Sequence, residues 1–442
     1  MDFVALLVLN VGMVSVLVAF SRSWAFGYLA GSAVNPLLVF CLISVLFNTD
    51  FVVVWFNPEL RFIERAPLLS PEIVVEAYWR YTFIFAGAAF GMIAAIMRSM
   101  ALVAGPIITP TAKREPSAML AANILFCGVL LFCTAALVLT LYHQTDDNLS
   151  YQMVAHQNPL SAIAAWIIPG SLALFMASQE RPFSLWPFTL FVCVFLLVVS
   201  TGGVRVIPLV CLLVGAITLA GYKRLPALWC VPAIPAAAVF LAYSRYVFRE
   251  QGNYPSFSDF VSANGGFVNL FFLSEELSFA KMFTAVYELS PALPVQPFVS
   301  ILAFFLAPLP RSLFPLKPYG PSAYFTQHAS PERWEWTKSE SLVTGYADLY
   351  WQFGVVGAFT AMAVIAFFWM SSCLLAIRAS RQWTITWIPI LIWWMYIFVR
   401  GDIFNVSLLL WPAVAVVMLH QFLTRLLSVF TVDRAHTTMQ PP

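Results

Sequence analysis

The sequence predicts an all-α, polytopic membrane protein, and three observations carry that prediction. Of the 442 residues, 61% are hydrophobic and 16% are aromatic, whereas only 10% are charged. Such a composition cannot be arranged around one water-soluble core. The apolar residues fall into about 11 stretches that approach the roughly 20 residues a helix needs to cross a bilayer. Finally, the basic residues collect after alternate stretches, as they do in multi-span proteins.

The predicted spans follow one another along the whole chain. In order they are residues 3–20, 26–47, 81–101, 118–142, 159–178, 184–201, 204–221, 226–243, 347–377, 383–399 and 404–424. The first follows Met1-Asp2 without a positively charged leader region, so we expect a retained span and not a signal peptide. Six of the seven cysteines lie inside apolar runs without a CxxC spacing, and we expect all seven to be buried small hydrophobes.

The positive charges assign a side of the membrane to each connecting segment. The residues that follow the third, fifth, seventh and ninth spans are Arg98, Lys113, Arg114, Arg181, Lys223, Arg224, Arg378 and Arg381. By the positive-inside rule these segments face the cytoplasm. Segments 48–80, 143–158, 201–205, 244–346 and 400–402 then face the outside, and the C-terminus returns to the cytoplasm.

Three regions result from this topology. Residues 1–243 form an N-terminal membrane bundle of about eight spans, residues 244–346 form a long outer region, and residues 347–442 form a C-terminal bundle of about three spans with a cytoplasmic tail. The outer region contains two apolar runs, Gly266–Leu273 and Pro297–Leu309, which are too short to cross. We expect them to be re-entrant or interfacial helices. So long and polar a segment in a compact membrane protein is usually functional.

The most informative element of the outer region is a proline-rich segment that contains two cations. Between Ala307 and Gly320, four prolines surround Arg311 and Lys317. Proline fixes φ and holds the preceding residue extended, so both cations are held rigidly beside the bilayer. A fixed cation pair at that depth costs solvation energy unless it meets an anion, and a phosphate is the anion most available there.

Other cations are predicted on the same side. Arg205 follows the Gly202-Gly203 pair at the head of the seventh span, where a helix N-terminus also favours an anion. Arg400 lies with Asp402 in the short turn between the last two spans. If the spans bundle, these arginines, Arg311 and Lys317 line one cavity at the outer leaflet. The alternatives are that Arg205 binds lipid phosphates at the interface and that Arg400 pairs with Asp402.

Several classes of function are not supported. The formal net charge of +2 and the absence of basic runs argue against a nucleic-acid partner. The five histidines are dispersed, without an HExxH motif or a carboxylate cluster, so no metal is expected. His328 lies in the outer region, and its plain alternative is a surface histidine.

Taken in order, these elements resemble the Wzy-type polymerases of lipid-linked oligosaccharide repeat units, the O-antigen polymerase family. The resemblance rests on three elements, which are a glycine-arginine turn (Gly202, Gly203, Arg205), a proline-arginine-proline-lysine-proline element (Pro310, Arg311, Pro315, Lys317, Pro318) and the segment ESLVTGYADLYWQFGVVG (Glu340–Gly357) entering the next span. The resemblance covers most of the chain as architecture.

The resemblance implies a GT-C-like glycosyltransferase of the bacterial inner membrane whose active site faces the periplasm. Such an enzyme transfers a growing glycan from undecaprenyl pyrophosphate to the next lipid-linked unit in O-antigen, lipopolysaccharide or other polysaccharide biosynthesis. It requires neither a cofactor nor a metal. Its partners are the undecaprenyl-pyrophosphate-linked oligosaccharide, membrane lipid and a chain-length-regulating co-polymerase.

The chemistry implied by the resemblance assigns a role to each candidate residue. The pyrophosphate leaving group needs cations, and the candidates are Arg205, Arg311, Lys317 and Arg400. The predicted catalytic residues are Arg311, Glu340 and His328; Glu335 and Asp402 stay open as bases. Tyr324, Trp334 and Trp336 suit stacking on sugar faces, and equally suit an interfacial aromatic belt.

Two alternatives stay open. An O-antigen ligase or another lipid-linked glycan GT-C transferase would use the same chemistry with a different acceptor. A flippase or transporter of lipid-linked oligosaccharide is less favoured, because a transporter typically has ionisable residues near the bilayer midplane and these span interiors carry almost none.

Overall fold

The structure is a computed structural model of the whole chain. It describes residues 2–56, 70–102, 116–143, 159–200, 206–221, 256–263, 279–295, 298–309, 316–337 and 343–437, together with isolated residues between 225 and 266 and Phe314. Regular structure in these residues is helical, apart from one isolated bridge between Ser32 and Pro226.

Seven helices are long and apolar enough to cross a membrane. They are α1 (Phe3–Phe20), α2 (Pro36–Phe56), α3 (Pro71–Leu102), α4 (Pro116–His143), α16 (Gly345–Ala379), α17 (Arg381–Arg400) and α18 (Ile403–Thr437). Three shorter apolar helices accompany them, namely α6 (Pro159–Ser178), α7 (Leu185–Ser200) and α8 (Val206–Ala220). The chain is therefore a polytopic helical membrane protein. The predicted eighth span, 226–243, lies almost entirely outside the described residues.

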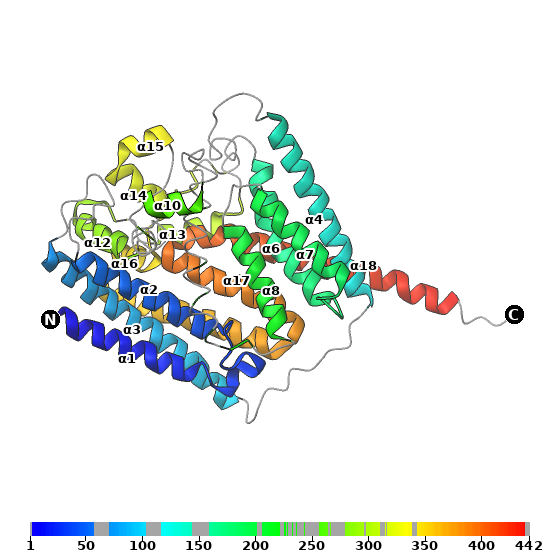
Figure 1. The fold of residues 1–442 in the computed structure, drawn as a ribbon, viewed down its shortest axis with the longest axis horizontal. Helices are drawn as coiled ribbons and strands as arrows, with labels where there is room; N and C mark the ends of the chain where they lie inside the picture. Colours follow the sequence, from blue (N-terminus) through cyan, green and yellow to red (C-terminus); the bar gives the residue numbers. More distant parts are fainter. Residues whose placement is uncertain are drawn as a thin grey trace.

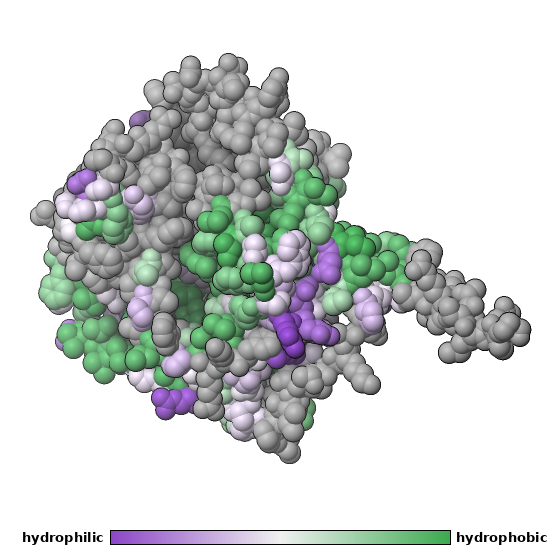
Figure 2. Space-filling view, turned by 45° about the vertical axis from the view of Figure 1, so that its right-hand side comes forward, coloured by the Kyte–Doolittle hydropathy of each residue, from purple (hydrophilic) through white to green (hydrophobic). Residues whose placement is uncertain are grey.

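The surface of the bundle is apolar. Phe90, Leu131 and Phe368 point outward with 65%, 72% and 64% of their surface exposed, and apolar side chains cover much of the described face in Figure 2. Lipid tails solvate such side chains as well as a protein core does. For this reason the cysteine prediction is partly wrong: Cys127 and Cys193 are exposed, whereas Cys41, Cys133, Cys211 and Cys373 are buried.

Helices α3 and α16 form the closest packing in the core. Gly87 and Gly91 of α3 lie against the backbone of Phe359 and Ala363 of α16, and a Cβ at either glycine would collide with a carbonyl oxygen. This GxxxG spacing places two small residues on one helix face and lets the backbones approach. Other residues of α16, from Asp348 to Ala379, are left to line a groove that is described below.

Five shorter helices lie together on one side of the long helices (Figure 1). They are α10 (Phe257–Ala263), α12 (Phe279–Leu289), α13 (Val299–Leu306), α14 (Pro321–Ala329) and α15 (Pro331–Thr337). Helix α13 comes from the apolar run Pro297–Leu309, and its eight residues are too few to cross a bilayer. The other predicted run, Gly266–Leu273, lies outside the described residues except for Gly266.

Helix α12 is anchored to the bundle by a buried aspartate of α2. The Asp50 carboxylate of α2 accepts a hydrogen bond of 2.6 Å from the backbone N–H of Ala280, in the first turn of α12. Lys281 beside it is only 4% exposed. Burial lowers the pKa of Lys281, and the negative charge of Asp50 opposes that shift. The hydrogen bond from Ala280 to Asp50 therefore fixes the start of α12 on α2.

Candidate functional site

A long groove runs along helix α16. It has a volume of about 1240 Å³, and its lining on α16 extends from Asp348, near the first residue of the helix, to Ala379, the last. At 1.5 Å per residue this stretch is on the order of 45 Å long. That is about the thickness of a bilayer with its headgroup regions. The groove is therefore long enough to follow a lipid chain through one leaflet and beyond.

The walls of the groove are apolar, and about a third of the lining residues are aromatic. Helices α13, α17 and the start of α18 complete the lining, and the aromatic lining residues are Phe298, Phe304, Phe305, Phe353, Phe368, Trp369, Trp383, Trp387 and Trp394. Phe305, Val364 and Leu375 on its rim are exposed on the surface of the bundle. A chain dissolved in the bilayer can therefore reach the groove from the side.

One end of the groove is polar. We call Ser300, Asp348 and Gln352 the polar head. The Ser300 hydroxyl donates a hydrogen bond of 2.8 Å to Oδ1 of Asp348, and the Gln352 side-chain amide donates to the same oxygen. Asp348 is 1% exposed in total. Its second oxygen, Oδ2, and the Gln352 Oε1 atom have no hydrogen-bond partner among the described residues.

The local sequence explains why Asp348 is held at this position. Thr344 caps α16, and its side chain accepts a hydrogen bond from the Ala347 N–H. This places Asp348 in the first turn, where the helix N-terminus stabilises a carboxylate. Six residues later Gly354 has φ of +66°, a conformation that favours glycine, and it interrupts α16 below the polar head.

A second buried carboxylate lies beside the polar head. Asp402, which precedes α18, is fully buried, and its charge interacts with that of Asp348. Its Oδ2 atom accepts a hydrogen bond of 2.8 Å from the backbone N–H of Ser322, in the first turn of α14. The Ser322 hydroxyl in turn accepts from the Val343 N–H. Asp402 thereby holds α14 over the head of the groove.

Two of the predicted sugar-stacking and catalytic residues lie on α14 near this head. The Tyr324 ring stacks on Trp351 of α16 with 5.7 Å between centroids. The His328 ring packs on Tyr324 at 4.4 Å, and its Nδ1 lies 2.8 Å from the Tyr324 carbonyl oxygen, to which it donates. The Nε2 atom of His328 is the one turned away from this bond, and the side chain is exposed. Trp334 of α15 packs instead on Tyr319.

The two described cations of the predicted phosphate site have different surroundings. The Lys317 ammonium donates hydrogen bonds of 2.9 and 3.1 Å to the carbonyl oxygens of Ala307 and Leu309, at the C-terminal end of α13. Arg400 is the last residue of α17, is half-buried and lies two residues before Asp402. Arg205, Arg311 and Glu340 lie outside the described residues, as does the side chain of Trp336. Their predicted roles stay predictions.

Sequence reasoning did not select Asp348, Ser300 or Gln352. Asp348 and Gln352 belong to the segment Glu340–Gly357, whose resemblance was noted as a whole. A usable signal was present, because Asp348 lies inside the predicted apolar span 347–377, and an aspartate there is costly unless it has a function. Within the described residues, no three His, Cys, Asp or Glu side chains are grouped as metal ligands.

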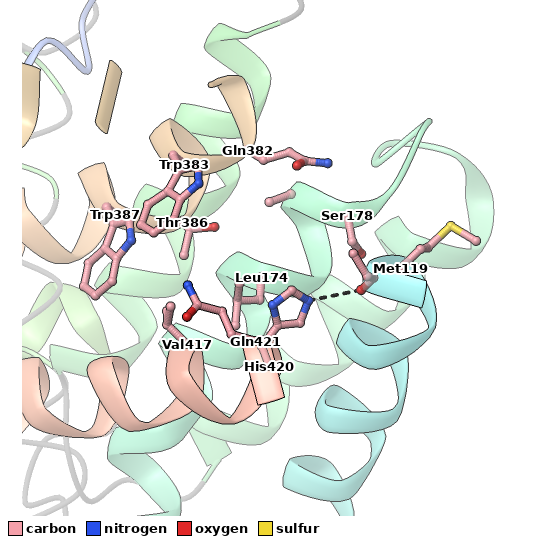
Figure 3. A pocket seen from close by; sticks show the side chains of 12 residues that line it. Met119, Leu174, Ser178, Gln382, Trp383, Thr386, Trp387, Val417, His420 and Gln421 are labelled. Atoms are coloured by element: carbon pink, nitrogen blue, oxygen red, sulfur yellow. Dashed lines mark hydrogen bonds between the residues drawn. The ribbon is translucent and has the colours of Figure 1, made fainter. Parts of the chain in front are cut away.

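A smaller pocket shares two walls with the groove. It has a volume of about 170 Å³ between α4, α6, α17 and α18, and Trp383 and Trp387 line both spaces. His420 points toward the start of α4 in Figure 3, where its Nε2 donates a hydrogen bond of 3.1 Å to the Ala118 carbonyl oxygen. This contact joins α18 to α4.

Comparisons with protein-family models, curated proteins and solved structures find no match for this chain.

Proposed function

We propose that this protein is a polymerase of undecaprenyl-pyrophosphate-linked oligosaccharide repeat units. In this proposal it is a GT-C-like glycosyltransferase of about 11 spans in the bacterial inner membrane. It transfers the growing glycan to a new lipid-linked unit on the periplasmic face, without a metal or cofactor. The observation that carries the proposal is the groove along α16, which is apolar over most of its length and polar at one end.

The groove suits a substrate with a long apolar chain and a polar headgroup. Its aromatic walls and exposed rim match a polyprenyl chain that arrives through the bilayer, and each buried CH₂ group contributes about 0.8 kcal/mol. The polar head, whose unpaired atoms are hydrogen-bond acceptors, then lies where the first sugars of such a lipid would bring their hydroxyl donors. Tyr324, half-buried on α14 and backed by Trp351, is the aromatic side chain proposed to contact a sugar there.

The cations predicted from the sequence complete the chemistry. When the glycosidic bond to pyrophosphate breaks, negative charge develops on the leaving group, and positioned guanidinium and ammonium groups stabilise it. Arg311, Arg205, Lys317 and Arg400 are the groups proposed for this task. An O-antigen ligase or another lipid-linked glycan transferase shares every one of these features, and differs only in the acceptor.

A flippase of lipid-linked oligosaccharide is the second candidate. The groove is about as long as a bilayer is thick, as a path across the membrane would be. A flippase must carry the glycan headgroup across the hydrocarbon region, which requires polar groups along the path. Between the polar head and Ala379, however, the lining is apolar apart from Thr360 and Ser372. This contrast supports transfer at one end of the groove.

Deletion of the gene separates the three functions. Surface polysaccharide with single repeat units indicates a polymerase, complete loss of glycan attached to lipid A indicates a ligase, and trapped intermediates on the cytoplasmic side indicate a flippase. A matched test uses the purified protein in liposomes with lipid-linked units extracted from the deletion strain. The wild type should produce a ladder of products, and a single product one repeat long would contradict the proposal.

The groove itself is tested by filling it. Ala361→Trp places an indole in the middle of the wall and should raise the KM for lipid-linked units at least tenfold. Leu131→Trp, on the exposed surface of α4, is the matched control and should have the wild-type KM. Equal KM values for both variants would show that the chain does not occupy the groove.

A further inference from the structure

The unpaired oxygen of Asp348 requires an explanation. More than nine in ten buried polar groups of folded proteins have a hydrogen-bond partner, and a buried acceptor without one costs about 1–3 kcal/mol. Oδ2 of Asp348 is buried and has no partner among the described residues. The same residue is one of those that line the groove. The position of this oxygen is therefore suited to a group that arrives with the substrate.

The other carboxylate oxygen is held firmly. Oδ1 accepts hydrogen bonds from Ser300 and Gln352, which lie on two different helices. This arrangement fixes the plane of the carboxylate and leaves Oδ2 as the free position. Within the polar head, the acceptor atoms without a partner among the described residues are Oδ2 itself and the Gln352 Oε1 atom. A hydroxyl group is the simplest donor that satisfies either of them.

Asp402 differs from Asp348 in its surroundings. Its Oδ2 accepts the Ser322 N–H at the first turn of α14, where the helix N-terminus favours a negative charge. Pairs of carboxyl groups with interacting charges and unequal environments commonly divide their tasks, one keeping its charge while the other exchanges a proton. Here the anchored member is Asp402, and Asp348 is the member that faces the groove.

We propose that Asp348 is the catalytic base that accepts the proton of the acceptor hydroxyl, an inference that rests on the proposed function. In this step the O–H bond of the acceptor breaks and its proton moves to Oδ2 of Asp348. The acceptor oxygen forms a bond to the anomeric carbon of the donor glycan. The bond from that carbon to the pyrophosphate oxygen breaks, and pyrophosphate leaves with the electron pair. Ser300 and Gln352 are positioning residues.

The test compares isosteric variants in liposomes with lipid-linked units from the deletion strain. Asp348→Asn keeps an acceptor oxygen for Ser300 and Gln352 but cannot take a proton, so the transfer rate should fall about 10²- to 10⁴-fold. Binding of a fluorescent polyprenyl pyrophosphate should stay within threefold of the wild type. Asp259→Asn, on exposed α10, is the matched control and should keep the wild-type rate.

A second variant distinguishes a chemical role of the Asp348 carboxylate from a structural one. Asp348→Ala leaves a space beside Ser300. Added formate supplies a carboxylate and should raise the transfer rate of this variant at least tenfold over its rate without formate. A purely structural role would give no rescue. If the wild type transfers glycan and Asp348→Asn does so at the same rate, or if folded Asp348→Ala is not rescued, the role of Asp348 is overturned. If the wild type transfers no glycan, that result contradicts the proposed function, and the role of Asp348 is overturned together with it.

Discussion

At the scale of the residue, Lys317 shows how a fold can give a charged side chain a purely structural partner. The sequence predicts that its ammonium binds pyrophosphate. In the structure, this ammonium donates to the carbonyl oxygens of Ala307 and Leu309. These carbonyls lie at the end of α13, where a helix leaves its last acceptors without intrahelical donors. Lys317 therefore stabilises the loop whether or not a substrate is present.

Replacement of Lys317 by methionine should lower the stability of the substrate-free protein. Methionine keeps an apolar stem but loses the charged hydrogen bonds, and the expected loss is about 1–3 kcal/mol. Thermal unfolding of the detergent-solubilised protein measures this effect. Leu316→Ala is the control, because the neighbouring Leu316 is 98% exposed. If the melting temperature of Lys317→Met matches that of the control, the ammonium does not hold the end of α13.

Asp348 shows why a site can escape sequence analysis. Its partners, Ser300 and Asp402, lie 48 residues before it and 54 residues after it, and each is at the edge of a different apolar segment. Their meeting depends on how α13, α16 and α18 pack, which residue spacing does not encode. By contrast, Tyr324 and His328 are one helical turn apart, so their contact follows from sequence spacing once α14 is known to be a helix.

At the scale of the element, the spans were the most predictable feature. A continuous apolar run of about 20 residues has few alternatives to a helix in a bilayer. The faces of the helices were less predictable, because lipid and protein core both accept apolar side chains. Cys127 and Cys193 illustrate this limit, since their apolar surroundings suggested burial and they face outward instead.

The contact between α3 and α16 depends on two glycines. We expect Gly91→Leu to separate the helices, because any Cβ at this position meets the backbone of Ala363. Overpacking of this kind typically costs 1–3 kcal/mol, and a branched side chain against a backbone should exceed about 2 kcal/mol. Thermal unfolding in detergent again measures the loss. Gly128→Leu in α4 is the matched control, since a Cβ there meets nothing within 4 Å; equal losses in the two variants would contradict close packing.

The pair of Asp50 and Lys281 should behave as a coupled unit. Asp50 and Lys281 are buried and their opposite charges interact, so removal of either leaves the other uncompensated. Asp50→Asn and Lys281→Met should each destabilise the protein by about 1–3 kcal/mol. In the double variant no charge is stranded, and most of the loss should be recovered. A double-mutant cycle of unfolding free energies measures the coupling. Additive losses would mean that the two charges do not interact.

At the scale of the whole molecule, the two ends of the bundle differ. Helices α10 and α12–α15 lie together on one side (Figure 1). One of them, α13, contributes Ser300 to the polar head of the groove. The small pocket around His420 lies near the starts of α4 and α17, which follow basic segments of the sequence. The charge pattern therefore predicts that the polar head faces outward.

Cysteine labelling tests this orientation. In a variant without the seven native cysteines, Leu316→Cys should react with a membrane-impermeant maleimide in intact cells that have an opened outer membrane. Arg22→Cys, exposed in the turn after α1, should react only after the inner membrane is permeabilised. The reverse pattern would place the polar head in the cytoplasm and would contradict the topology.

The open rim of the groove has a consequence for how a substrate is exchanged. Because Val364, Phe368 and Leu375 are exposed along α16, a chain can enter and leave without passing through water or threading a tunnel. If the occupant is the proposed carrier lipid, its capture is an encounter in two dimensions, and the frequency of that encounter follows the density of the lipid within the membrane. In the proposed function, a product that has grown by many sugar units would depart by the same lateral route, since its chain stays within hydrocarbon throughout.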